Sequence, residues 1–348
     1  MPSKHLICIA LVLTALISCK KKHEPSPQPP PVDKPFVTDV YVAGYTIQNG
    51  GSSTTGVYWK NGRLMPFSTD MNTTIYAITV QDTDVYMAGT TSNGAAYWKN
   101  GNVTYLHPGA SYISQAYAIA VSGTDIYVGG TVAHSGDSNG RAVYWKNGAE
   151  TDLTSGSSTA LVNAIVVSGS DVYSAGQNNQ PDFDNVAGVS VAALWKNQTQ
   201  IPLDGAVVAS YGSFAKGIAV SGNDVYVAGY IEFGAALWKN GSLQNLDDNS
   251  GYPFGSAGFA VGVNKTDVYV IGEHGNEAAY WKNGTIKDMI SGTFTASGVN
   301  GICFQGDDVY MSGSLNNDAV YWKNDTVNTM QSTGATTVVS CIAVSRHQ

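Results

Sequence analysis

The tripeptide Trp-Lys-Asn occurs seven times in this chain of 348 residues, and it accounts for all seven tryptophans. These tryptophans are residues 59, 98, 145, 195, 238, 281 and 322, so successive copies lie 39 to 50 residues apart. A second motif, Asp-(Val/Ile)-Tyr, also occurs seven times, and a glycine follows each of its aspartates five positions later. Repeats of about 40–50 residues made of strand-length pieces are typical of β-propellers. The sequence therefore predicts an all-β fold with one blade for each repeat.

One repeat shows the expected blade. Ala118–Val121 alternates small and branched residues and is predicted as the innermost strand, which we call strand A. A tight turn leads to strand B at Ile126–Gly130, and a variable stretch leads to strand C at Ala142–Trp145. The Asn-Gly pair that follows is a strong hairpin signal, and it precedes strand D at Ala149–Leu153.

The two ends of the repeat region predict how the ring closes. The first repeat lacks a strand A, because Phe36–Thr38 runs directly into its Asp-Val-Tyr motif. The last repeat is followed by Cys341–Ser345, which has the strand-A pattern and no strand B after it. We expect this segment to join the first blade, because closure removes two free sheet edges. The predicted fold is a seven-bladed β-propeller of four-stranded antiparallel blades.

The repeat resembles the bacterial HAF-repeat propellers. That family has an Ala-x-x-Trp-x-x-Gly segment, a Leu shortly afterwards, and then an Ala-Ile strand that leads to a Gly. The matching residues are Ala95–Gly101, Leu106, Ala118-Ile119 and Gly129. The resemblance extends from about residue 36 to the end of the chain. It implies a propeller fold, but the family has no common activity that it would imply for this chain.

The residues that recur in every blade are predicted to be structural. The seven tryptophans should fill the wedges between neighbouring blades, and stacking on a glycan is their alternative role. The motif aspartates are predicted at the turns between strands A and B, where a carboxylate can accept backbone N–H groups. The motif lysines are predicted at the turns between strands C and D, on the same solvated face of the ring.

The first 35 residues are predicted to target the protein to the cell envelope. Residues 1–18 are predicted to form a signal peptide with the apolar run Leu6–Ile17, and Cys19 follows directly after it. Leu16–Cys19 resembles a bacterial lipobox, in which the cysteine is lipidated, and an ordinary signal peptide is the alternative. Residues 19–35 are a Pro-rich tether, and residues 36–348 form the propeller. We expect a lipid anchor in the outer membrane, on the periplasmic or the surface side.

The variable segments indicate where a ligand binds. The turns A–B and C–D are short and repeated, whereas the links B–C and D–A vary and should lie on the opposite face, the loop face. The longest predicted loops are Thr131–Arg141, Gln177–Val191, Ala110–Gln115, Ala206–Lys216, Asp247–Gly258 and Ser291–Ser297. Binding residues commonly lie on loops held by a rigid scaffold. We therefore expect the ligand at the mouth of the central channel on this face.

Charge narrows the class of ligand. Outside the two motifs and the first 35 residues, the propeller has 6 basic and 17 acidic residues, a balance of −11. Nucleic acids and polyanionic glycans need basic patches, so the sequence argues against them. Neutral glycans, cationic peptides and Ca²⁺ remain compatible.

The candidate ligand-binding residues are aromatic, acidic or histidine side chains in or beside the variable segments: Tyr112, His134, Asp137, Asp182, Asp184, Tyr211, Phe214, Phe233, Tyr252, Phe254, His274 and Glu277. Aromatic residues suit sugar stacking, and loop anchoring is their alternative. His134, Asp137, Glu273, His274 and Glu277 would form a metal or acid–base cluster if their loops converged. Asp182-x-Asp184-Asn185 resembles a fragment of a Ca²⁺ loop, with a plain polar loop as the alternative. We predict no catalytic residue, metal ligand or cofactor, apart from Ca²⁺ as an ion to test.

The sequence shows no motif for hydrolytic, metalloprotease or phosphate chemistry. We therefore favour a monomeric, membrane-anchored binding or scaffold propeller that holds a carbohydrate or protein partner on its loop face. The alternative is a glycan hydrolase or lyase with acidic residues near the channel. Cys303 and Cys341 fall in equivalent inner strands of neighbouring repeats. We expect two buried thiols there, with a disulfide as the alternative.

Overall fold

The computed structural model describes residues 36–48, 53–67, 72–107, 109, 111–137, 139–179, 189–206, 212–232, 234–246, 255–275, 277–289, 296–316 and 318–348. Across these ranges the chain forms 28 strands and no helix, so no helical membrane span is found in them. The predicted signal peptide, Cys19 and the Pro-rich tether lie outside the described residues.

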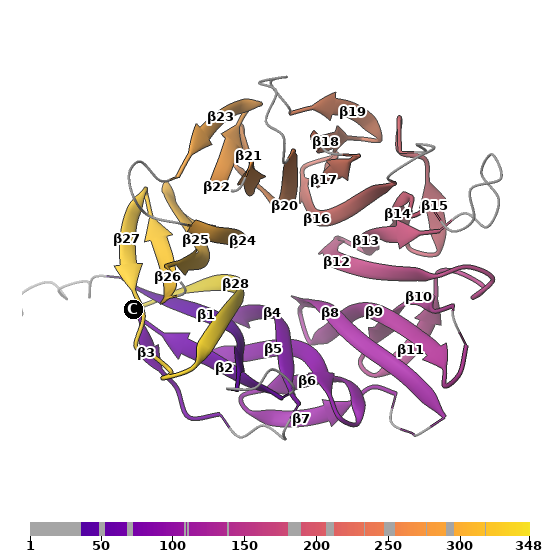
Figure 1. Ribbon diagram of the computed structural model, residues 1–348, viewed down its shortest axis with the longest axis horizontal. Coiled ribbons are helices and arrows are strands. Elements are labelled where there is room, and N and C mark those ends of the chain that lie inside the picture. The colour runs from indigo at the N-terminus through magenta and orange to yellow at the C-terminus, as the bar shows by residue number, and fades with distance from the viewer. Residues whose placement is uncertain are drawn as a thin grey trace, which may run out of the picture. The chain divides into compact units, whose positions relative to one another are not determined.

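The strands form seven four-stranded antiparallel sheets, which confirms the predicted blades. In the order A to D, blade 1 consists of β28 (Thr336–His347), β1 (Val37–Ile47), β2 (Thr54–Lys60) and β3 (Arg63–Leu64), and blade 2 of β4 (Thr74–Gln81), β5 (Asp84–Thr91), β6 (Gly94–Lys99) and β7 (Asn102–Tyr105). Blade 3 consists of β8 (Tyr112–Ser122), β9 (Asp125–His134), β10 (Arg141–Lys146) and β11 (Ala149–Asp152), and blade 4 of β12 (Ala160–Ser168), β13 (Asp171–Asn178), β14 (Ala192–Lys196) and β15 (Thr199–Ile201). Blade 5 consists of β16 (Ser213–Ser221), β17 (Asp224–Ile231), β18 (Gly234–Lys239) and β19 (Ser242–Asn245). Blade 6 consists of β20 (Ser256–Asn264), β21 (Asp267–His274), β22 (Glu277–Lys282) and β23 (Thr285–Asp288), and blade 7 of β24 (Ala296–Gln305), β25 (Asp308–Leu315), β26 (Asp318–Lys323) and β27 (Thr326–Thr329). The blades follow one another around a ring with strand A innermost (Figure 1).

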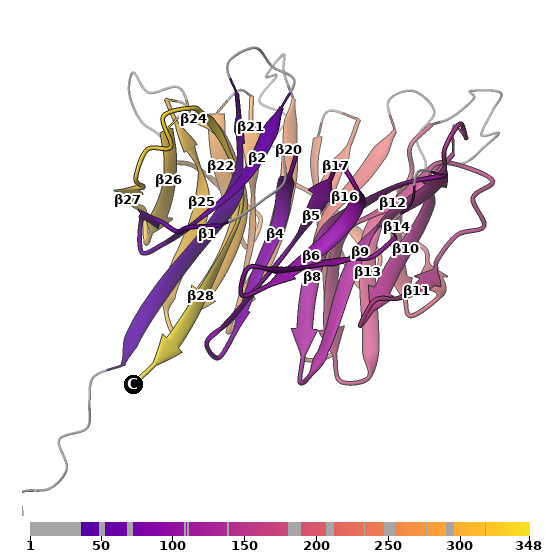
Figure 2. The same ribbon diagram turned by 90° about the horizontal axis from the view of Figure 1, so that it is seen from below.

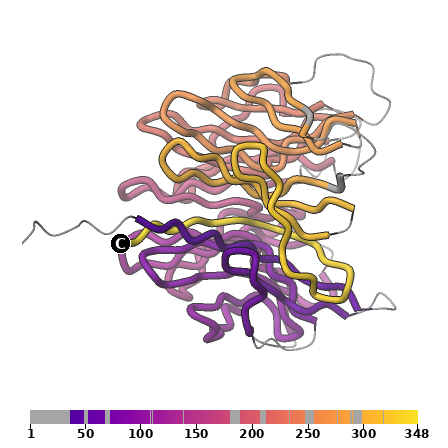
Figure 3. Tube along the Cα trace, turned by 90° about the vertical axis from the view of Figure 1, so that its left-hand side faces the viewer, coloured from indigo at the N-terminus to yellow at the C-terminus, as the bar shows by residue number. Residues whose placement is uncertain are grey.

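The C-terminal strand closes the ring as predicted. β28 pairs antiparallel with β1 along its whole length, from Val37 opposite His347 to Ile47 opposite Thr336. Figure 3 shows these two ends of the described chain side by side. β28 thus supplies the strand A that the first repeat lacks.

The tryptophans fill the wedges between blades, which confirms their structural role. All seven are at most 2% exposed. Trp145 of blade 3, for example, shares a buried cluster with Tyr86, Ala88 and Ala95 of blade 2. Burial of large apolar side chains is the main stabilising term in such a core, so each tryptophan holds two neighbouring blades together.

The two motifs of each blade form one polar unit, which we call the clasp. In blade 3, Lys146 Nζ lies 2.7 Å from Asp125 Oδ2, and Asn147 Nδ2 donates a hydrogen bond to Asp125 Oδ1 at 2.7 Å. The Asn147 Oδ1 atom accepts the backbone N–H of Ile126 at 2.9 Å. The same three contacts occur in all seven blades.

The clasp differs from what the sequence predicted. The aspartates accept hydrogen bonds from the lysine and asparagine side chains, whereas the backbone N–H goes to the asparagine. Lys146 and then Asn147 lower the pKa of Asp125, because both donate hydrogen bonds to its charged form. Asn147 and Gly148 both have positive φ, which is the backbone of a type I′ hairpin turn. The Asn of Trp-Lys-Asn therefore serves the turn and the clasp together.

The predicted division into two faces holds, although the loops are shorter than expected. Turns between strands A and B lie along one edge of the ring, the lower edge in Figure 2. On the other face, the predicted loop Thr131–Arg141 is reduced to residues 135–140, because β9 ends at His134 and β10 begins at Arg141. In blades 2, 5, 6 and 7 only two residues separate strands B and C. Strand A also begins earlier than predicted, at Tyr112, Ser213, Ser256 and Ala296, so the ends of four predicted loops are strand.

A β-bulge in every strand A explains the longer strands. In blade 2 the pairing register between β4 and β5 shifts between Ile75 and Ala77, which leaves Tyr76 without an opposite residue. Equivalent shifts occur in the other six blades. A bulge inserts one extra residue and bends the strand. It therefore interrupts the alternation by which a strand is recognised in the sequence.

The repeated glycine of strand B lies opposite the bulge. A Cβ atom on Gly229 would lie 1.8 Å from the backbone oxygen of Phe214, and the other six glycines would meet the equivalent oxygen at 1.9 to 2.3 Å. No side chain fits at such a distance, so each bulge requires a glycine across from it. The recurring Gly is thus a consequence of the bulge in strand A.

Cys303 and Cys341 are free thiols in the structure. Cys303 lies in β24 and Cys341 in β28, which are neighbouring inner strands. Burial raises the pKa of both thiols well above the usual range. They therefore behave as small apolar side chains of the inner wall.

Candidate functional site

The seven bulges present one side chain each to the central channel. These residues, which we call the channel ring, are Ser340, Tyr76, Tyr117, Asn163, Lys216, Phe259 and Asn300 in blade order. All seven are half-buried. They line a cavity of about 380 Å³ together with Tyr45, Val338 and Val339, which lie towards the loop face. A second cavity of about 230 Å³ shares the whole ring and extends towards the A–B turns.

The channel ring contrasts with the rest of the blade. Residues of the clasp and the wedge are nearly identical from blade to blade. The ring positions are structurally equivalent, yet they carry two Tyr, two Asn, one Lys, one Phe and one Ser. The blades require a bulge at these positions, but they do not require the same side chain in every blade. The side chains of the channel ring therefore differ from blade to blade, although all seven border the same cavity.

One side of the channel is aromatic. The rings of Tyr76 and Tyr117 lie 5.1 Å apart between centroids, and Tyr45 meets Tyr76 edge-on at 6.4 Å. Tyr117 donates its hydroxyl hydrogen bond to Gln115 Oε1 at 2.5 Å. Burial, with a smaller contribution from Tyr76, raises the pKa of Tyr117 to about 12. These three tyrosines form a neutral apolar arc over blades 1 to 3.

Two asparagines hold fixed positions in the ring. Asn163 Nδ2 donates a hydrogen bond to the backbone oxygen of Ala215, and Asn300 Nδ2 donates one to that of Val339, both at 2.8 Å. Each contact crosses to the next blade. Their amide oxygens make no hydrogen bond to any other described residue, so two oriented acceptors border the cavity.

Lys216 is the charged residue of the channel ring. Its Nζ lies 5.5 Å from the ring centroid of Phe214, which in turn stacks on Tyr230 at 4.7 Å. Burial lowers the pKa of Lys216, because a cation is less stable away from water. Among the described residues, no carboxylate lies within ion-pair distance of its ammonium group.

The described residues that line the two cavities include no Asp or Glu. Glu273 of β21 is not among these lining residues, and burial raises the pKa of its carboxyl group. Burial and, to a smaller extent, the negative charge of Glu273 raise the pKa of Tyr230, so Glu273 lies near the Tyr230 side chain. Hydrolysis of a glycosidic bond by the usual mechanism needs two carboxylates at a set separation. The lining side chains described for this channel do not supply such a pair.

The structure brings some of the sequence-predicted residues into contact, but it places them outside the lining of the central cavity. Tyr112 stands between two histidines, with ring centroids 4.3 Å from His107 and 4.4 Å from His134. Asp137 lies in the exposed turn after His134, to which it is joined by a backbone hydrogen bond. Phe214 contacts the channel lysine. None of these four candidates lines the central cavity.

The remaining candidates are placed apart or are not described. His274 is buried and Glu277 is exposed, and they pair across the end of β21 and β22 in blade 6. They lie three blades from His134 and Asp137. Outside the described residues lie Asp182, Asp184, Tyr211, Phe233, Tyr252 and Phe254. A ligand role for all twelve candidates stays a prediction.

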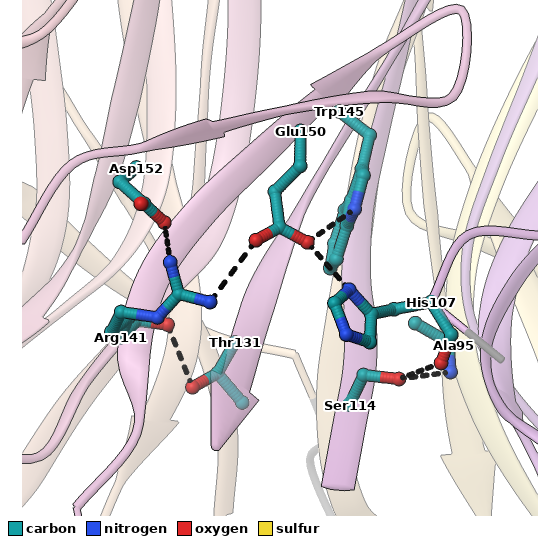
Figure 4. A network of polar contacts seen from close by, with 8 residues as sticks. All are labelled: Ala95, His107, Ser114, Thr131, Arg141, Trp145, Glu150 and Asp152. Atoms are coloured by element: carbon teal, nitrogen blue, oxygen red, sulfur yellow. Dashed lines mark hydrogen bonds and ion pairs between the residues drawn. The ribbon is translucent and has the colours of Figure 1, made fainter. Parts of the chain in front are cut away.

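A polar network holds the D–A link between blades 2 and 3 (Figure 4). Glu150 of β11 accepts hydrogen bonds from Trp145 Nε1 at 3.1 Å and from Arg141 at 3.1 Å, and its Oε2 lies 2.8 Å from His107 Nδ1. Arg141 also pairs with Asp152. Because these groups satisfy one another within the protein, we interpret the network as structural.

We expect Glu150→Ala to lower the free energy of unfolding by about 2 kcal/mol, because it removes hydrogen bonds to a charged acceptor and leaves Trp145 Nε1 unpaired. Glu150→Gln is the control, since it keeps an acceptor for the tryptophan and should lose about half as much. Chemical denaturation monitored by tryptophan fluorescence would measure both. Equal stability of Glu150→Ala and wild type would show that the network contributes nothing.

The residues of the channel ring were not predicted from the sequence, although the repeated glycine of strand B indicates their position. Three bulge residues, Tyr117, Lys216 and Ser340, lie before the predicted starts of their strands. The repeated Gly of strand B was recognised, but its cause was not. A glycine at the same place in every strand B indicates close approach of a backbone, and it points to the residue opposite in strand A.

Comparisons with known proteins give no family for this chain. No family model matches it, and no curated protein matches it. Solved structures similar to it include a computationally designed protein, Ika8, with TM-score 0.47 and 16% identity over 86% of this chain and 96% of that one. Others are a chain of the nidogen/laminin complex (TM-score 0.45, 11% identity, 78% of this chain and 97% of that one) and YjhT (TM-score 0.44, 13% identity, 79% and 97%). The resemblance to HAF-repeat propellers therefore stays a prediction.

Proposed function

We propose that this protein is a carbohydrate-binding propeller that takes its ligand into the central channel from the loop face. The observation that carries the proposal is the channel ring. Seven equivalent positions in an otherwise repeated framework carry unlike side chains, and all of them border one cavity. A structural role would favour the same residue in every blade, as at the tryptophans. Unlike residues around one space are what recognition of an asymmetric ligand requires.

Size and chemistry favour a sugar. A cavity of about 380 Å³ lies at the small end of the range of about 300–1,000 Å³ for small-molecule pockets. A cavity of this size can hold the end of a sugar chain. The apolar arc of Tyr45, Tyr76 and Tyr117 offers ring faces to C–H groups, and the amide oxygens of Asn163 and Asn300 offer acceptors to hydroxyl groups.

We further propose that a lipid on Cys19 holds the propeller at the outer membrane. The support is the lipobox-like Leu16–Cys19 after an apolar run and the Pro-rich segment before the propeller. Metabolic labelling with a radioactive fatty acid would test this. Wild type should incorporate the label and Cys19→Ala should not; equal labelling of both would contradict the proposal.

A glycan array probed with residues 36–348 tests the binding function, with calorimetric titration of each hit. Tyr76→Ala and Tyr117→Ala should each weaken binding about 10-fold, which corresponds to the loss of about 1.4 kcal/mol of contact with the sugar. Tyr112→Ala is the matched control. It removes a tyrosine that stacks on histidines outside the cavity, so binding should be unchanged.

The outcomes separate the alternatives. Binding that survives both channel substitutions but is lost in Tyr112→Ala would move the site to the cluster predicted from the sequence. Absence of any glycan hit would refute the carbohydrate function. Release of shorter sugars during the titration, detected by chromatography, would show that the protein is a glycan-degrading enzyme.

A further inference from the structure

Lys216 is an anomaly among the basic residues of the propeller. Each motif lysine pairs with the aspartate of its own blade. Of the other basic residues, Arg141, Lys265 and Lys287 also pair with carboxylates. Arg63 and Arg346 pair with no described carboxylate, but both are exposed to solvent, whereas Lys216 is half-buried. Lys216 instead projects into a cavity whose described lining has no acidic residue. In a protein with more acidic than basic residues, an unpaired cation at this position needs a reason.

The fold does not require a lysine at this position. The six equivalent bulges are formed by Ser, Tyr, Tyr, Asn, Phe and Asn. Burial of an ammonium group without an anionic partner is unfavourable, because the contact with the Phe214 ring replaces only part of the hydration that the group loses. A residue that costs stability and is not needed by the framework is commonly retained for a ligand.

We propose that Lys216 binds a carboxylate of the ligand, so that the sugar recognised in the channel is a uronic acid. This inference rests on the proposed carbohydrate function and specifies its substrate class. The ammonium group would form a charge-assisted hydrogen bond with the carboxylate. Asn163 and Phe259 flank Lys216 in the ring, and the tyrosine arc lies across the channel, so the acidic end and the ring face of the sugar have separate partners.

The charge balance favours a single acidic group. One lysine compensates one carboxylate, whereas a phosphate ester carries a charge of about −1.5 to −2 near pH 7. The propeller outside its motifs has a balance of −11, which repels polyanions. A carboxylate-bearing end of a glycan is therefore favoured over a phosphosugar or a continuous polyuronate chain.

Titration of the propeller with glucuronate, galacturonate, glucose and glucose 6-phosphate tests the proposal. Wild type should bind one or both uronates at least about 10-fold more tightly than glucose and glucose 6-phosphate, in keeping with one charge-assisted hydrogen bond. Lys216→Met should abolish this preference. Lys265→Met is the matched control, because it removes an exposed charge that pairs with Asp307 outside the channel lining, and it should keep the preference.

Proton uptake gives an independent readout. A carboxylate beside Lys216 favours its charged form, so binding should take up protons at alkaline pH, where part of the free amine is neutral. Calorimetry at pH 10 in two buffers of different ionisation enthalpy should show proton uptake for wild type and none for Lys216→Met. The melting temperature of Lys216→Met should equal or exceed that of wild type, which separates lost recognition from lost folding.

Three results would overturn the proposal. Equal binding of glucose and the uronates, or a preference for glucose 6-phosphate, would show that no carboxylate is selected. Failure of both uronates to bind while array glycans bind through Tyr76 and Tyr117 would refute the acidic ligand and leave the carbohydrate function standing. Loss of binding in Lys265→Met as well would show that Lys216 has no specific role.

Discussion

Removal of residues 341–348 is expected to lower the melting temperature of the propeller by more than about 10 °C and to reduce its soluble yield. These residues form most of β28, the strand A of the first blade. Ile342 is buried in the core between blades 7 and 1, and Ala343 in the core between blades 1 and 2. Full burial of one large aliphatic side chain contributes about 1.5–3 kcal/mol, so the loss should reach several kcal/mol.

The deletion also creates an unpaired edge. Without residues 341–348, Val37–Ala43 of β1 lose their partners in β28 and have a free row of backbone donors and acceptors on the inner side. Removal of His347 and Gln348 alone is the control, because both are exposed, and it should leave the melting temperature within about 2 °C. Thermal denaturation monitored by circular dichroism would measure both. If the longer deletion melts like wild type, β28 does not close the ring.

Gly229→Ala should be the most damaging single substitution among those considered, with a loss of about 3 kcal/mol or more. The added Cβ would lie 1.8 Å from the backbone oxygen of Phe214 and 2.9 Å from its carbonyl carbon. Both atoms belong to the backbone, so no side-chain rotation relieves the clash. The bulge in β16 would have to open, and β16 also carries Lys216. Binding in the channel should therefore weaken together with stability.

Gly222→Asp is the matched control for this prediction. Gly222 lies in the A–B turn of the same blade with φ of 60°, and its Cβ would meet nothing within 4 Å. The same turn position is occupied by Asp82 in blade 2 and Lys265 in blade 6, at φ of 55° and 57°. Urea denaturation should therefore show a loss of no more than about 1 kcal/mol, because a left-handed backbone costs Asp less than most residues. An equal change in the free energy of unfolding for both substitutions would mean that the backbone of the bulge leaves room for a side chain at the strand-B glycines.

The parts of the fold that could be predicted are those that depend on local spacing. Trp145 lies close to Asp125 in the sequence, and the contacts of each motif stay within one blade or reach the adjacent one. The repeated unit can therefore be recognised in the sequence from the regular spacing of its motifs. The surplus strand at Cys341–Ser345 was recognisable because it matches an inner strand with no partner after it.

The candidate site could be predicted only as a region. The loop-face end of the channel was expected, and the cavity lies there, but the residues that line it were not among those proposed. Tyr76 lies between Ile75 and Ala77 in an apolar run, where period-2 alternation does not reveal a bulge. Tyr112 and His134 were proposed because they stand in variable segments, yet they pair across β8 and β9 and stack on each other.

The sequence by itself determined the number of blades, the position of the closing strand and the residues that hold neighbouring blades together. It did so because each of these depends on contacts that recur once per repeat. Only the tertiary structure decided which seven unlike residues border one cavity, since these lie about one repeat apart and meet only when the ring closes. The structure likewise decided that Lys216 has no acidic partner among the described residues. Whether Lys216 has an acidic partner depends on distances between residues of different blades, which the spacing along the chain does not encode.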